Sequence, residues 1–191
     1  MRPVTHISSR TIVLPLDDID TDQIIPARYL TTTVKEGLGQ HLFTDWRYTA
    51  DGSENTAFVL NQPGAENAAV LVTGRNFGCG SSLEHAPWAL LDYGFKVVIS
   101  TEIADIFLNN SLKNGLIPVI VDAETHRWLL ENPGIEVSVD IEELELVIHE
   151  HQPIPFCIDR FARHCLLNGV DQLGFLLQHS EAIDAFEART R

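Results

Sequence analysis

The sequence predicts an α/β fold in which helices flank a mixed, partly parallel sheet. Its middle third alternates short apolar runs with helical segments, a pattern typical of βαβ units. Its final third returns to segments that alternate apolar and polar residues, as antiparallel strands do. The 191 residues are 45% hydrophobic and 21% charged, which is ordinary for a globular protein. We therefore expect one domain over residues 1–191 with a helical extension at its C-terminus.

The first two thirds of the chain supply most of the parallel sheet. Residues 11–14 are prone to form a strand, and residues 26–67 are rich in Gly, Thr, Asn and Asp, which predicts loops with short elements. Gly94, Gly115 and Pro133-Gly134 each end a helical segment. The expected alternation of strand and helix follows at 69–73, 84–93, 96–100, 103–114, 116–121 and 123–131. The helix expected at 103–114 would carry Ile103, Ile106, Phe107 and Asn110 on one face.

The final third predicts a hairpin and further helices. Residues 136–139 and 144–148 alternate around a polar turn, so they are expected to pair, and residues 155–158 are expected to add a strand. Asp159 is placed to cap a helix that ends at Asn168-Gly169. A last amphipathic helix is expected around residues 182–186.

Charge and cysteine content exclude several classes of partner. The chain has 27 acidic and 13 basic residues and a net charge of −14, so nucleic acid and anionic membranes are poor partners. No apolar run approaches the roughly 20 residues of a membrane span, and no secretory signal is visible. Three cysteines without a CxxC pair argue against a disulfide framework or a metal or iron–sulfur site in this chain. A cytoplasmic location and no bound cofactor are expected, with Cys157 and Cys165 as small buried residues.

Residues 74–88 form the segment that is richest in chemical groups. Their sequence, Gly-Arg-Asn-Phe-Gly-Cys-Gly-Ser-Ser-Leu-Glu-His-Ala-Pro-Trp, joins a predicted buried strand to a helix. Ligands of open α/β sheets bind beyond the carboxyl ends of the strands. Glycines allow the backbone to approach a ligand closely, and free amides near a helix N-terminus favour an anion.

The residues alone leave more than one interpretation of this segment. Ser81 and Glu84 match a capping box, although Pro87 would then lie beyond the first helical turn. A nucleotide-phosphate loop is disfavoured, because the third glycine of GxGxxG and a Gly-Lys-Ser/Thr sequence are missing. The third interpretation is an active-site turn that presents Ser81 to a small anionic substrate. Capping and catalysis remain open at this point.

This segment also resembles that of a known family. Together with Asp20-Thr21-Asp22-x-Ile24-Ile25-Pro26, His41-Leu42-Phe43-x-Asp45-Trp46-Arg47 and Arg163-His164-Cys165, it resembles the small subunits of bacterial 3-isopropylmalate dehydratases over nearly the whole chain. That family is related to aconitase, and the resemblance implies a swivelling β/β/α domain of aconitase type. It implies a hydro-lyase that interconverts 2-isopropylmalate and 3-isopropylmalate in leucine biosynthesis. It also implies a large partner subunit that holds a [4Fe-4S] cluster.

The resemblance assigns roles to individual residues. It implies that Ser81 removes the proton from the substrate carbon, with amides near Gly78 and Gly80 stabilising its alkoxide. It places a substrate-reading loop at Tyr29, Leu30, Thr31, Thr32 and Thr33. The loop is neutral, which favours an isopropyl group over an extra carboxylate, although an ordinary Thr-rich loop is the competing interpretation. The other expected substrate contacts are Gly80, Ser82 and Leu83, and the supporting residues are Asp22, Gly78, Cys79 and His85.

Two of these assignments have structural alternatives. Asp22 is expected to orient a neighbouring or partner cation, but it could instead cap a turn. His85 is expected to be a hydrogen-bonded structural residue rather than a catalytic acid.

Leu83 departs from the family pattern. Members of the family normally read Ser-Ser-Arg-Glu-His, whereas this chain reads Ser-Ser-Leu-Glu-His. The arginine is expected to bind a substrate carboxylate, which leucine cannot do. Two alternatives therefore stand beside the main interpretation: a subunit acting on another small 2-hydroxy acid, or a weakly active or noncatalytic partner subunit.

Overall fold

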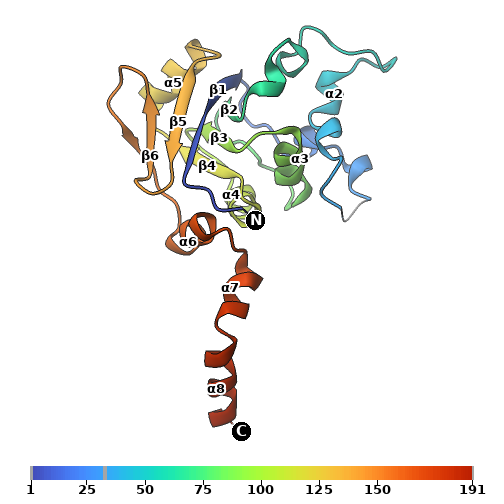
Figure 1. Cartoon of the computed structure of the whole chain (residues 1–191). Helices are drawn as coiled ribbons and strands as arrows, with labels where there is room; N and C mark the ends of the chain where they lie inside the picture. The colour runs from blue at the N-terminus through green and yellow to red at the C-terminus, as the bar shows by residue number, and fades with distance from the viewer. Residues whose placement is uncertain (1, 32–33, 191) are drawn as a thin grey trace.

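The computed structural model describes residues 2–31 and 34–190, and its centre is a seven-stranded sheet in the order β4-β3-β2-β1-β5-β6-β7 (Figure 1). Strand β1 (His6–Leu14) joins two halves of different character. Its first five residues pair antiparallel with β5 (Glu136–Asp140), and its last four pair parallel with β2 (Val70–Thr73). The predicted mixed sheet is confirmed.

The parallel half continues from β2 to β3 (Val97–Ser100) and β4 (Ile117–Ile120). These strands are nearly all apolar, because helices cover both faces of a parallel sheet. The antiparallel half is the predicted hairpin of β5 and β6 (Glu145–Ile148), extended by the short β7 (Ile154–Pro155).

Two hydrophobic clusters lie on opposite faces of this sheet. Leu71 and Val98 point into the first, against α3 (His85–Tyr93) and the segment that precedes β2. Their neighbours Val70 and Val72 point into the second, because successive side chains of a strand alternate between faces. The second cluster includes side chains of α5 (Ala123–Glu131) and α6 (Arg160–Asn168), whereas α4 (Asp105–Asn114) contributes to both.

The segment between β1 and β2 contains only short elements, as predicted. Helix α1 (Thr21–Ile24) carries a capping box, in which the Asp20 carboxylate accepts from the Gln23 amide and the Gln23 side chain bonds the Asp20 amide. The remaining elements are α2 (Thr44–Arg47) and the 3-10 turns η1 (Ala27–Tyr29), η2 (Gly39–His41), η3 (Val59–Asn61) and η4 (Ala65–Asn67). Contacts join η2 and α1 to α3, so this segment lies over the helix that follows the candidate turn.

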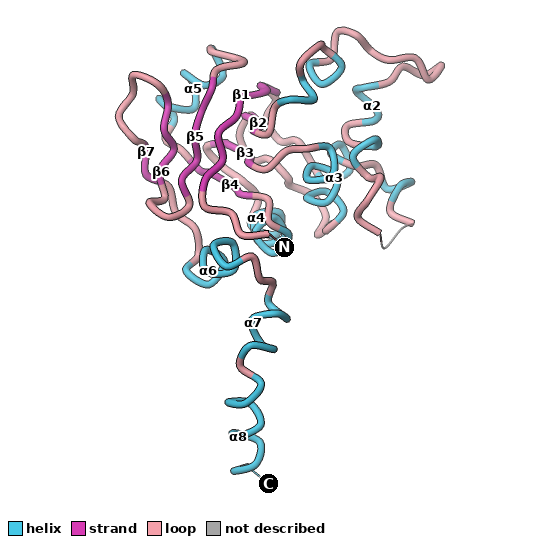
Figure 2. Tube along the Cα trace, viewed as in Figure 1, coloured by secondary structure: helices cyan, strands magenta, loops and turns pink. Residues whose placement is uncertain are grey.

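Two helices at the C-terminal end, α7 (Gln172–Gln178) and α8 (Ser180–Thr190), project away from the sheet (Figures 1 and 2). We call residues 172–190 the arm. The Phe175 ring of α7 packs edge-on against the Phe161 and His164 rings of α6, with centroid distances of 4.9 and 5.6 Å. No helix among the described residues is long and apolar enough to cross a membrane.

The structure corrects several expected details. β1 begins at His6 rather than residue 11, because its first half pairs with β5 and not with β2. Ile106 is 54% exposed, so it does not share the buried face of Phe107, and Ile103 is buried but precedes α4. The last expected strand is only Ile154–Pro155. Cys157 is exposed, whereas Cys165 is buried as expected. Helix α7 was not predicted.

Ser111 offers a test of the packing of α4. Its side chain is fully buried, and its hydroxyl has no hydrogen-bond partner among the described residues. An unsatisfied buried hydroxyl is costly, and alanine has the higher helix propensity. We expect Ser111→Ala to raise the free energy of unfolding by about 1 kcal/mol in urea titrations. A loss of stability instead would mean that the hydroxyl is satisfied in solution.

Candidate functional site

The turn between β2 and α3 is held by the backbone on both of its sides. The Gly78 amide donates to the Ile19 carbonyl at 2.7 Å, and the Thr21 amide donates to the Cys79 carbonyl at 2.9 Å. On the other side, the Ala104 amide donates to the Phe77 carbonyl at 3.0 Å. These bonds extend the parallel arrangement beyond the carboxyl end of β2 and fix the path of the turn.

Two positions of this turn require glycine. Gly78 has φ of +75°, and a Cβ there would lie 2.2 Å from the Phe107 ring. Gly80 has φ of +95°, and a Cβ would lie 3.3 Å from Thr21 Oγ1. At Gly78 the left-handed conformation and the overlap with Phe107 together exclude a side chain, whereas at Gly80 the left-handed conformation strains one and the contact with Thr21 would be tight. Gly78 is buried and Gly80 is exposed, so the chain emerges at the surface just before Ser81.

A buried threonine positions Ser81. The Ser81 amide donates to Thr21 Oγ1 at 3.2 Å, and the Thr21 hydroxyl lies 3.1 Å from the Ser81 carbonyl oxygen and 3.3 Å from Ser81 Oγ. Thr21 is 1% exposed, whereas Ser81 is exposed. The sequence indicates no role for Thr21, because Ser81, the residue that it contacts, is 60 positions away in the chain.

The capping interpretation of Ser81 is wrong. Helix α3 begins at His85, and its N-cap residue is Glu84, one residue from the predicted start. Ser81 lies before the helix, and its carbonyl accepts from the Leu83 amide at 2.9 Å in a tight turn. Its side chain is therefore available at the surface beside the N-terminal end of α3.

The other residues expected at the site lie in this turn, at the start of α3 or on α1. Ser82 is exposed and Leu83 is half-buried, and His85 opens α3 with its ring 4.8 Å from that of Trp88. Burial raises the pKa of the Cys79 thiol, and the charges of Asp20 and Asp18 add to this effect. The thiol is therefore protonated and suits a packing role. Asp22 is exposed on α1, but the cap of that helix is Asp20, so the turn-capping alternative for Asp22 is wrong.

The expected substrate-reading loop is described only in part. Tyr29 is half-buried and stacks on His41 with ring centroids 3.9 Å apart, and Leu30 packs against the first cluster. Thr31 is exposed, and Thr32 and Thr33 lie outside the described residues. A hollow of about 670 Å³ opens beside Tyr29 and His41, but its lining does not include the turn that carries Ser81.

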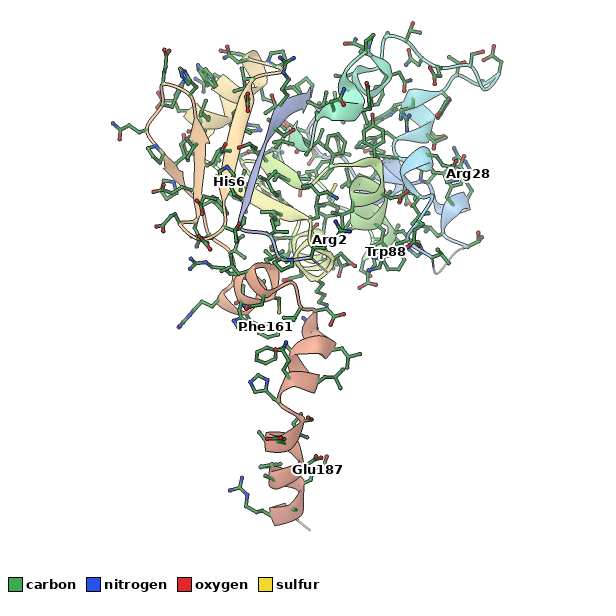
Figure 3. The ribbon with its side chains drawn as sticks, in the orientation of Figure 1. Arg2, His6, Arg28, Trp88, Phe161 and Glu187 are labelled. Carbon is green, nitrogen blue, oxygen red and sulfur yellow. The ribbon has the colours of Figure 1, made fainter. Side chains whose placement is uncertain are left out.

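Lys35 is a cation beside α3 that the sequence did not reveal. Its Nζ donates to Asn114 Oδ1 at 2.8 Å and lies 5.2 Å from the centre of the Trp88 ring. Trp88 Nε1 donates to the same Asn114 oxygen, so the lysine links the chain after the loop to α3 and α4 (Trp88 is labelled in Figure 3). Only spatial proximity could identify this contact, because Lys35 and Asn114 are 79 residues apart.

Arg28 and Arg75, two arginines that could supply positive charge, are each paired with a carboxylate. Arg28 forms an ion pair with Asp45, and this hydrogen-bonded contact raises the pKa of its guanidinium. Arg75 Nη1 lies 3.3 Å from Glu102. Among the described residues no ion pair joins Lys35 to a carboxylate. Its ammonium group contacts the Asn114 side-chain amide and the Trp88 indole, which are neutral.

The three cysteines of the chain lie apart from one another. Cys79 lies in the turn, Cys157 follows β7, and Cys165 lies in α6, so the three thiols belong to separate parts of the fold. In residues 2–31 and 34–190, no group of three or more His, Cys, Asp or Glu side chains could hold a metal ion.

Comparisons with known proteins agree with the motif in the turn. The model of the aconitase C-terminal domain family matches residues 1–124. A 3-isopropylmalate dehydratase small subunit of Anaeromyxobacter dehalogenans is 58% identical over the whole of both chains. One from a Roseiflexus species is 55% identical, covering 98% of this chain and 94% of its own. The crystal structure of 3-isopropylmalate dehydratase from Methanocaldococcus jannaschii aligns with a TM-score of 0.68 and 30% identity, covering 95% of this chain and 99% of that one.

Gly78 tests the packing of the turn. Gly78→Ala should lower the free energy of unfolding by about 2–4 kcal/mol, because alanine would be strained at positive φ and would overlap the Phe107 ring. Gly52→Ala is the matched control: Gly52 has φ of +84°, but nothing lies within 4 Å of its would-be Cβ. Gly52→Ala should lower the free energy of unfolding by only about 1 kcal/mol. Urea titrations of both variants measure the two losses. Equal losses for the two variants would contradict the close contact with Phe107.

Proposed function

Because the chain belongs to the family of 3-isopropylmalate dehydratase small subunits, we propose that it supplies one half of a hydro-lyase that interconverts 2-isopropylmalate and 3-isopropylmalate. The observation that carries the proposal is Ser81, exposed on a glycine-flanked turn at the carboxyl end of a buried parallel strand. Relatives of this name that match the full chain favour this function over the alternatives that Leu83 left open. The reaction would serve leucine biosynthesis, and we place the chain in the cytoplasm.

The other half of the site belongs to a large subunit. A [4Fe-4S] cluster of the aconitase type would bind the substrate hydroxyl and a carboxylate, and the described part of this chain offers no ligand set for it. We therefore place the cluster in the large subunit, facing the turn that carries Ser81. The substrate would lie between the two chains.

Ser81 would take the proton from the substrate carbon. A serine hydroxyl is a weak base, so its alkoxide must be stabilised. The buried Thr21 hydroxyl donates to the Ser81 carbonyl, accepts from the Ser81 amide and lies 3.3 Å from Ser81 Oγ. Its single proton would turn from the carbonyl to the alkoxide as the alkoxide forms. The N-terminal end of α3 adds a positive dipole. Together these groups would lower the cost of forming the alkoxide.

The surroundings of Ser81 suit a substrate with one apolar branch. Gly80, Ser82 and half-buried Leu83 would contact the substrate from this chain, with Tyr29, Leu30 and Thr31 on the side of the isopropyl group. Asp22, exposed on α1 beside the turn, would meet a cation of the large subunit.

Assembly is the direct test of this proposal. The chain purified alone should show no iron–sulfur absorbance and no hydratase activity, because the site is shared. Mixed with its cognate large subunit, it should interconvert the two isopropylmalates in a coupled assay, and a panel of other small 2-hydroxy acids should react more slowly. Turnover by the chain alone would end the two-subunit proposal.

Ser81→Ala should lower kcat of the assembled enzyme by about a thousandfold or more. The side chain is exposed and does not cap α3, so the melting temperature of the chain should not change. Ser53→Ala, which changes an exposed loop serine, is the control for activity. If Ser81→Ala keeps normal turnover, the assignment of Ser81 as the base is wrong.

Leu83→Arg should raise kcat/KM for isopropylmalate at least tenfold. An arginine at this position could form a charge-assisted pair with a substrate carboxylate, and tenfold corresponds to only ~1.4 kcal/mol. Leu83→Met, which adds no charge, is the matched control and should leave kcat/KM within about twofold. If the native chain is already efficient and Leu83→Arg changes nothing, position 83 does not contact the carboxylate.

A further inference from the structure

The arm exposes an unusual share of the apolar surface of the molecule. Of the eleven large hydrophobic side chains that are exposed among the described residues, five lie between residues 173 and 186. Leu173, Leu176 and Leu177 are 64%, 53% and 65% exposed, and Ile183 is 40% exposed. Contiguous apolar surface of this kind marks an interaction site more often than an ordinary solvated face.

These side chains lie on the side of α7 that the domain does not use. Leu173, Leu176 and Leu177 are three and four residues apart, so they share one face of the helix. Phe175 lies on the opposite face, where it packs against Phe161 and His164 of α6. Contacts with the domain therefore hold the arm at its base. They leave uncovered the face formed by Leu173, Leu176 and Leu177, which we call the leucine face.

We propose that the leucine face of the arm docks on the large subunit, an inference that rests on the proposed two-subunit function. The base of the arm adjoins the candidate site. Leu173 lines a hollow of about 200 Å³ together with Lys35 and Glu84, and Glu84 directly follows Leu83. A partner that covers the turn at Ser81 and extends over this hollow would reach the base of the arm.

The area of the leucine face argues against a second copy of this chain as its occupant. Its three leucines, together with Ile183 of α8, offer about 100 Å² each, or roughly 400 Å² per arm. A stable interface buries about 800 Å² on each partner. Pairing of two arms would therefore supply about half of what a dimer needs. The face is sufficient only as part of a larger interface, and the surface around Ser81 supplies the rest.

Leu177→Glu tests the proposal in the full chain. It should raise the Kd for the cognate large subunit at least tenfold in calorimetric titrations, because a carboxylate would be buried against an apolar partner. Gln178→Glu is the matched control: it adds the same charge to the neighbouring position, which is not three or four residues from any of the three leucines. It should change Kd by less than about twofold. Both variants should keep the native melting temperature, and both should approach native kcat when the large subunit is saturating.

The outcomes separate this inference from the proposed function. If the native chain assembles into an active enzyme and Leu177→Glu binds as tightly as native, the arm is not a docking surface and the proposed function stands. If Leu177→Glu instead abolishes a homodimer of the isolated chain in sedimentation velocity and leaves heterodimer affinity unchanged, the occupant is a second copy and the inference is wrong. If the native chain does not bind the large subunit at all, both proposals fail.

Discussion

The close approach of the Gly78 backbone to the Phe107 ring is the contact on which the candidate site depends. It brings the turn against α4, where a side chain at position 78 would not fit, and it lets the Gly78 amide reach the Ile19 carbonyl. The T-shaped contact between Phe77 and Phe107, with centroids 5.2 Å apart, anchors the same point in the first cluster. A packed aromatic core therefore sets the direction in which the chain leaves toward Ser81.

Thr21 connects this turn to a second part of the chain. It is buried on α1, a helix of only four residues whose capping box makes it locally self-sufficient. Its amide and hydroxyl contact the backbone of Cys79 and Ser81, so a short helix from the first third of the chain fixes the geometry of a turn in the middle third. The exposed serine thus rests on rigid neighbours, which is what a group that must be preorganised for a proton transfer requires.

The elements with a strong local pattern were predictable, and those that depend on distant partners were not. The apolar strands β2, β3 and β4 and the glycine-terminated helices between them lie within one or two residues of their expected positions. The first half of β1 is mostly polar, so its sequence does not indicate a strand. It forms one because β5 pairs with it. The glycine-rich turn and Ser81 could be singled out from sequence, because positive φ and a strand-to-helix junction leave a local trace. Thr21 and Lys35 could not be, because each acts through residues 60 or more positions away.

Under the proposed function, electrostatics gives a physical reason why this chain would need a partner to bind a dicarboxylate. Its net charge of −14 opposes the approach of any anion. Arg28 and Arg75 are neutralised by Asp45 and by Glu102, and the family arginine at position 83 is a leucine. Lys35 alone among these cations keeps a charge that no described carboxylate pairs, and a single exposed ammonium is worth little in water. Under the proposed function, the positive charge that holds two carboxylates would come mainly from the opposite wall of the site. Closure against that wall would also exclude water and strengthen the charge–charge interactions within the site. A subunit built in this way would gain affinity for its substrate only on assembly, and the proposed chemistry of Ser81 would be confined to the complete complex.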